Sequence, residues 1–108
     1  VHTIQNHGKC PDNQDSFITA SSGSKSLVAV LDGHGEQGGR VSQFVKVQLA
    51  KSLFSNKDLH SDPAAALESA FFETQRLIER SHTFDALHSG TTAVAVYRHR
   101  DRLYIANV

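Results

Sequence analysis

The chain has 108 residues, enough for one small domain, and its 39% hydrophobic and 20% charged residues are typical of a globular protein. Eleven lysines and arginines balance eleven aspartates and glutamates, so neither nucleic acid nor a membrane is expected as a partner. No apolar run approaches the length of a membrane span. The single cysteine, Cys10, excludes an intrachain disulfide and a cysteine-rich zinc site, and it favours an intracellular location, cytoplasmic or nuclear.

Two β-prone runs near the N-terminus predict a hairpin. Residues 16–20 form the first run, and residues 27–31 form an aliphatic stretch rich in valine that is typical of a buried strand. The polar cluster between them contains Gly23-Ser24, a pair suited to a two-residue hairpin turn. A turn centred on this pair fixes the register, because the numbers of any two facing residues then sum to 47.

This register places two carboxylates side by side at the open end of the hairpin. Asp15 faces Asp32, and their Cβ atoms are expected to lie about 5 Å apart. Like charges so close to each other destabilise a hairpin. A bound cation would reverse the sign of that interaction, so the pair is a candidate cation site.

Two amphipathic helices are predicted after the hairpin. The first runs from about residue 39 to 54, where apolar and small side chains recur at helical spacing. The second begins at Asp62-Pro63, a capping side chain followed by a proline at the first helical position, and it ends near His82.

Two further strands are predicted over residues 91–97 and 102–108, joined by a charged turn at 98–101. The element order is therefore β-β-α-α-β-β, which belongs to the α+β class. The last strand has no turn or cap after it, so the sequence is expected to be a fragment that continues beyond Val108.

The chemistry-bearing motif is Asp32-Gly33-His34-Gly35, which ends the aliphatic strand. A glycine at this position lets backbone atoms approach a ligand closely, and an aspartate beside a histidine is suited to metal-assisted hydrolysis. The other histidines fall in predicted loops and polar turns without metal-ligand spacing, and we interpret them as solvated surface residues: His2, His7, His60, His82, His88 and His99.

Gly33, Gly35 and Gly38 also have the G-x-G-x-x-G spacing of a dinucleotide-binding loop. We reject this interpretation because a second helix, not a strand, follows the first helix, so no strand end exists for the acidic residue that would bind the ribose. Asp32 would also place a negative charge against the pyrophosphate. No nucleophilic serine motif is present either, and residues 89–93 are interpreted as a small, glycine-containing start of a strand that packs closely near the site.

Four segments together resemble a known enzyme family. They are Asn13-Gln14-Asp15, residues 27–35, Ser89-Gly90-Thr91-Thr92-Ala93 and residues 103–108. In order and spacing they resemble the N-terminal part of the metal-dependent type 2C protein serine/threonine phosphatases. The resemblance implies that residues 1–108 are the N-terminal portion of a single catalytic domain, and that they form part of a sandwich of two antiparallel sheets flanked by helices.

The resemblance also implies a site with two divalent cations, Mg²⁺ or Mn²⁺, and phosphoprotein substrates. Asp32 would bridge the two metals and the Gly33 carbonyl would bind one of them. Asp15 would orient water on a metal, and His34 resembles the general acid that protonates the leaving serine or threonine oxygen. The resemblance does not specify the oligomeric state.

Some residues depart from the family pattern. Gln14 stands where many members have a glutamate near the metals, and Leu31 stands where an aromatic residue is common. Cys10 stands where many members have a phosphate-binding arginine, with Lys9 adjacent as a weaker substitute. The family's further metal-binding aspartates follow the part of the domain that the resemblance covers, and none of them is among residues 1–108. A non-catalytic, phosphatase-like regulatory or binding module is therefore the alternative function.

Overall fold

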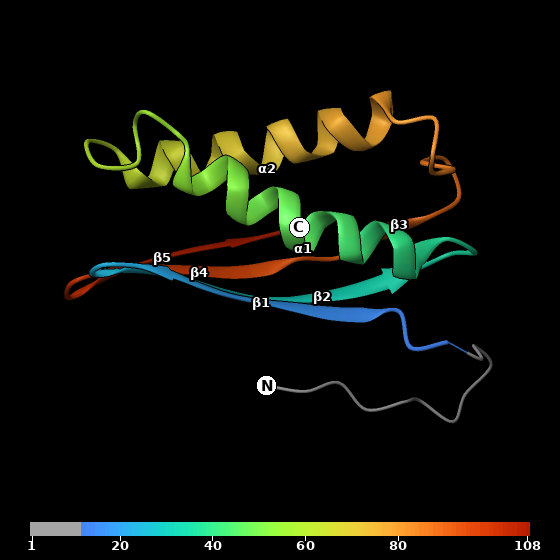
Figure 1. Cartoon of the computed structure of the whole chain (residues 1–108), viewed down its shortest axis with the longest axis horizontal. Helices are drawn as coiled ribbons and strands as arrows, with labels where there is room; N and C mark the ends of the chain where they lie inside the picture. The colour runs from blue at the N-terminus through green and yellow to red at the C-terminus, as the bar shows by residue number, and fades with distance from the viewer. Residues whose placement is uncertain (1–11) are drawn as a thin grey trace.

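The computed structural model describes residues 12–108, which form one antiparallel sheet with two helices on one of its faces (Figure 1). The predictions about Lys9, Cys10, His2 and His7 lie outside these residues. The elements in chain order are β1 (Asp15–Ser22), β2 (Lys25–His34), α1 (Gly38–Phe54), α2 (Pro63–Arg80), β3 (Gly90–Thr91), β4 (Val94–His99) and β5 (Arg102–Asn107). The predicted α+β class is confirmed.

The first hairpin has the predicted register. β1 pairs antiparallel with β2 so that Ser22 faces Lys25 at the turn and Asp15 faces Asp32 at the open end. Gly23 has a φ of 61°, a left-handed conformation that glycine adopts without steric cost. The turn thus fixes which residues meet at the open end, seven positions along each strand from the Ser22–Lys25 pair.

The sheet contains strands from both ends of the described residues, with the helices between them in the sequence. Its strand order is β1-β2-β4-β5, with β4 paired to β2 and β5 at the edge, while β3 pairs separately with the end of β2. At the end of the sheet that carries Asp32, β2 is therefore the central strand, since β1 lies on one side of it and β3 on the other.

The strand predicted over residues 91–97 is wrong in one respect, because it is broken into β3 and β4. The break falls at Thr92, whose backbone N–H donates to the Asp32 carbonyl (2.9 Å) while its Oγ1 accepts from the Asp32 N–H (3.2 Å). A side-chain oxygen replaces a ladder carbonyl here, so regular pairing stops. Ala93 then exchanges two backbone hydrogen bonds with Val108, each 2.9 Å long.

The core lies between the helices and the sheet. Alternate residues of β2 point toward the helices and are buried, among them Leu27, Ala29 and Leu31. The buried faces of the two helices pack against these residues. They contain Val41, Val45, Leu49 and Leu53 from α1 and Ala66, Leu67, Ala70 and Ile78 from α2. Burying each large aliphatic side chain stabilises the fold by roughly 1.5–3 kcal/mol before entropy is counted.

The helix boundaries largely agree with the sequence. Asp62 caps α2 by accepting a hydrogen bond from the Ala65 N–H (3.2 Å), and Pro63 occupies the first turn, as predicted. α2 ends at Arg80, two residues before the predicted end near His82. Neither of the two helices is both long and apolar enough to cross a membrane.

The sheet face turned away from the helices is apolar and open over the described residues. Val30 is 63% exposed and Ile105 is 70% exposed, and both lie on this face with Val28 and Val94. The described chain contains one sheet, and this outer face has the composition that the second sheet of a sandwich would cover.

Candidate functional site

Three side chains singled out in the sequence share one corner of the sheet. Asp15 and Asp32 face each other across β1 and β2, and His34 lies two residues beyond Asp32 on the same strand. Because alternate residues of a strand point to the same face, Asp32 and His34 both point away from the helices. All three residues are exposed, whereas the intervening Gly33 is buried.

The backbone of Asp32 is fixed from both sides. Its pairing with β1 holds one side, and the two hydrogen bonds with Thr92 hold the other. The next residue has no room for a side chain, because a Cβ on Gly33 would lie 2.5 Å from the Gly38 carbonyl oxygen and 2.6 Å from that of Gln14. The turn from strand to loop therefore requires glycine after the candidate metal ligand.

Gln14 performs a role that its sequence position does not reveal. Its side-chain amide donates to the Gly35 carbonyl (2.7 Å), and its own carbonyl accepts from the Gly33 N–H (3.3 Å) and the Ser42 hydroxyl (2.7 Å). A glutamate carboxylate could not donate to Gly35. The amide thus holds the loop of residues 35–37 between β2 and α1, the site loop, against the start of β1 and α1.

His34 lies against the start of β3. It pairs with Gly90, and a Cβ built on Gly90 would lie 2.9 Å from Nε2 and 3.0 Å from Cε1 of the imidazole. Gly35 has a φ of 85° and packs on the same segment, since a Cβ there would lie 2.1 Å from the His88 carbonyl oxygen. The predicted close packing of residues 89–93 near the site is confirmed.

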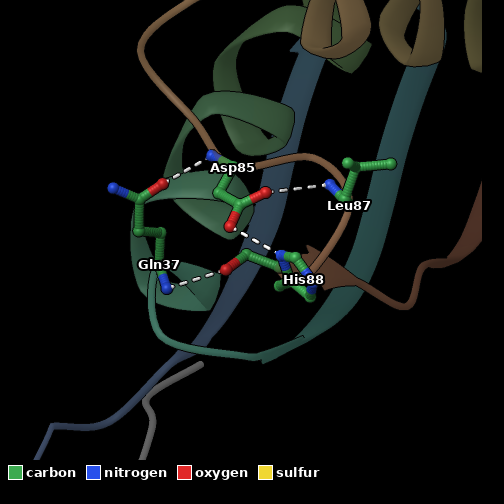
Figure 2. A network of polar contacts seen from close by, with 5 residues as sticks. Gln37, Asp85, Leu87 and His88 are labelled. Atoms are coloured by element: carbon green, nitrogen blue, oxygen red, sulfur yellow. Dashed lines mark hydrogen bonds and ion pairs between the residues drawn. The ribbon is translucent and has the colours of Figure 1, made fainter.

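A polar network ties the site loop to the segment before β3 (Figure 2). Gln37 accepts from the Asp85 N–H through Oε1 (2.6 Å) and donates its own N–H to Ser89 Oγ (2.9 Å). The Asp85 carboxylate accepts from the Leu87 N–H (3.2 Å) and pairs with His88 Nδ1 (2.8 Å). The hydrogen bond from His88 is the largest cause that lowers the pKa of Asp85. Desolvation opposes it, and the charge interaction with His88 and the backbone hydrogen bonds of Leu87 and His88 add to the lowering.

The candidate metal donors are hard oxygens: the carboxylates of Asp15 and Asp32 and the backbone around Gly33. Such donors suit Mg²⁺ and Mn²⁺. Among residues 12–108 there is no group of three or more histidine, cysteine, aspartate or glutamate side chains that could enclose a metal ion. The residues present therefore fit part of a divalent-cation site and leave the rest of the coordination to other donors.

Other polar side chains lie away from this corner. The prediction that His99 is a solvated residue of the 98–101 turn is wrong, because it is the last residue of β4 and half-buried. Its ring lies 6.3 Å from that of His60. His82 and His88 are exposed, as predicted.

An apolar groove of about 750 Å³ lies between α2 and β5 and contains none of the candidate site residues. Phe71, Phe72 and Tyr104 are among its lining residues. The lining residues include no lysine or arginine to attract a phosphate, so we place the chemistry at the Asp32 corner and not in this groove.

Comparison with known proteins gives concordant results. A family model described as protein phosphatase 2C matches residues 2–108. The chain is 36% identical over 101 residues to the probable protein phosphatase 2C 35 of Arabidopsis thaliana, covering 90% of this chain and 29% of that protein. It is 29% identical over 114 residues to protein phosphatase 1F of Rattus norvegicus, covering 98% of this chain and 25% of that protein.

A solved structure supports the fold. The serine/threonine phosphatase PstP/Ppp of Mycobacterium tuberculosis superimposes with a TM-score of 0.67 at 24% identity, covering 93% of this chain and 42% of that chain. The chain spans less than a third of the length of both curated relatives described above.

Proposed function

This chain belongs to the protein phosphatase 2C family, and from that premise we propose that residues 1–108 are the N-terminal portion of the catalytic domain of a metal-dependent protein serine/threonine phosphatase. The proposed reaction is hydrolysis of phosphoserine and phosphothreonine in phosphoproteins by water activated at a two-metal site. The observation that supports it most is the corner where Asp15, Asp32 and His34 share one exposed face.

Asp32 and the Gly33 carbonyl would hold the cations, Mg²⁺ or Mn²⁺, with Asp15 beside them. When bound, a pair of divalent cations supplies a hydroxide near neutral pH and neutralises charge on the phosphoryl group. The fixed backbone of Asp32 supports this role, because a ligand held by β1 and Thr92 does not have to be ordered when a cation arrives.

Asp15 and His34 would divide the proton transfers. Asp15 accepts a hydrogen bond from the attacking water and so aims its lone pair at phosphorus. His34, on the same face and held against Gly90, donates a proton to the serine or threonine oxygen as the phosphorus–oxygen bond breaks. General acid catalysis of this kind contributes typically ~10² to 10⁴-fold.

A phosphopeptide assay on the intact protein, with any sequence that flanks these residues, tests the proposal. We expect turnover with millimolar Mn²⁺, none after chelation, and loss of turnover in Asp32→Asn. Asp101→Asn is the matched control, because Asp101 is exposed in the turn between β4 and β5. Metal binding without turnover would instead favour the non-catalytic regulatory or binding module.

A further inference from the structure

Gln37 hydrogen-bonds the loop that follows His34 to the 84–90 segment, which precedes and includes the start of β3, while His34 itself pairs with Gly90. This glutamine lies just before α1 and bonds the segment twice, with its side chain to the Asp85 N–H at 2.6 Å and with its backbone to Ser89 Oγ at 2.9 Å (Figure 2). Ser89 is only 6% exposed, so its hydroxyl is committed to this contact.

The 84–90 segment is itself a closed turn seated on α1. The Ser89 N–H donates to the Asp85 carbonyl at 2.9 Å, which closes the turn. Phe84 packs edge-on against Phe44 of α1, with ring centroids 5.4 Å apart, and the Arg40 guanidinium lies 5.8 Å from the Phe84 ring. The turn therefore behaves as one body that α1 supports.

The end of this turn forms the wall behind His34. Gly90 lies against the imidazole, and the His88 carbonyl lies against Gly35, with no space for a methyl group at either glycine. A shift of the turn relative to the site loop must therefore move the imidazole. Two hydrogen bonds oppose such a shift. One depends on the Gln37 side chain as acceptor, and the other depends on the Ser89 hydroxyl.

We propose that Gln37 and Ser89 are positioning residues for His34: together they hold the 84–90 segment against the site loop and so fix the direction in which the imidazole presents its proton. The inference rests on the proposed role of His34. Loss of the Gln37 contacts should affect His34 and not the metal ligand Asp32. The backbone of Asp32 is held by β1 and Thr92, and neither contact involves Gln37.

Two variants of the intact protein test this inference, Gln37→Met, which keeps the length of the side chain but removes the acceptor, and Ser89→Ala. We expect turnover of a phosphoserine peptide to fall about tenfold to a hundredfold, as for a misplaced catalytic group. Turnover of p-nitrophenyl phosphate, whose leaving oxygen needs little protonation, should fall much less. Mn²⁺ affinity and the melting temperature should change little.

Two further variants sharpen the comparison. Gln37→Glu retains an acceptor for the Asp85 N–H and should recover much of the phosphoserine rate. Gln43→Met is the matched control, because Gln43 is an exposed glutamine on α1 outside the network. A readout without catalysis is the NMR signal of the His34 imidazole, which should move in Gln37→Met and Ser89→Ala and stay in place in Gln43→Met.

An unmoved His34 signal in both Gln37→Met and Ser89→Ala would overturn the inference, as would an equal loss of rate on both substrates. A wild-type protein that binds Mn²⁺ without turning over phosphopeptide would overturn the proposed function instead. The NMR comparison then still decides whether Gln37 and Ser89 position the imidazole.

Discussion

Asp15 and Asp32 stand directly opposite each other at the open end of the β1–β2 hairpin, with both carboxylates exposed. Cβ atoms of directly opposed residues lie about 5 Å apart, and like charges at that spacing destabilise the pairing. The cost becomes a benefit when a cation lies between them, since the carboxylates then attract one common charge. The relationship thus stabilises the hairpin only when a cation is bound.

His34 is expected to act on the leaving group. In the intact protein, His34→Gln should slow hydrolysis of phosphoserine peptides by roughly 10² to 10⁴-fold, because the departing alkoxide loses its proton donor. Aryl phosphates should be slowed much less. Steady-state kinetics on both substrates makes the comparison, with the exposed His82→Gln as control. Equal losses on the two substrates would contradict the assignment.

Gly33 and Gly39 should respond oppositely to alanine. Gly33→Ala places a Cβ 2.5 Å from a backbone carbonyl oxygen and should cost about 1–3 kcal/mol of unfolding free energy. Gly39→Ala, whose nearest neighbours are 3.8 Å away within a helix, should be neutral or stabilising by up to about 1 kcal/mol. Chemical denaturation of the intact protein measures both, and similar effects at the two positions would be inconsistent with the packing described.

The Asp85–His88 pair should show in the acid titration of Asp85. The pKa of Asp85 is lowered, chiefly by the hydrogen bond from His88, so the pair stabilises the turn fully above the ordinary aspartate value of about 3.9. That contribution is lost as the pH falls through the lowered pKa. His88→Ala should raise the pKa toward the ordinary value, as followed by NMR of the carboxyl carbon, whereas His82→Ala should not. An unchanged titration in His88→Ala would show that the pair does not form.

Residues 1–108 alone are expected to be inactive. Hard divalent cations take about six oxygen ligands each, and the described residues offer two carboxylates at one corner. The outer sheet face, with Val30 and Ile105 exposed, should also promote association of the isolated chain. The check is an assay of the expressed fragment on a phosphopeptide with millimolar Mn²⁺, together with its size in solution. Robust metal-dependent turnover by a monomeric fragment would contradict our account of the site.

The parts of the fold that the sequence predicts correctly are those specified locally. The Gly23-Ser24 turn sets the hairpin register, so the meeting of Asp15 and Asp32 follows from counting residues. Asp62-Pro63 likewise marks the start of α2 by its own capping chemistry. The break at Thr92 was not predicted, because a run of threonine, alanine and valine favours a continuous strand. The interruption depends on a hydrogen bond to Asp32, 60 positions away.

The hydrogen bonds that support the site cannot be predicted from the sequence, and the reason is physical. Gln14 reaches Gly35 over 21 positions, and Gln37 reaches Asp85 and Ser89 over 48 and 52 positions. Side-chain hydrogen bonds over such separations leave no periodicity or spacing in the sequence. From the sequence, Gln14 is only a departure from the family's glutamate, whereas in the structure its amide donates to a backbone carbonyl to which a carboxylate could not donate.

The proposed function depends most on Asp32 as a metal ligand at the end of β2. Calorimetric titration of Mn²⁺ into the intact protein, wild type against Asp32→Ala, tests it most directly, with Asp101→Ala as control. We predict that Asp32→Ala loses most of its Mn²⁺ affinity while its metal-free melting temperature stays close to that of the wild type, and that Asp101→Ala binds normally. A binding isotherm for Asp32→Ala that matches the wild type would contradict the claim.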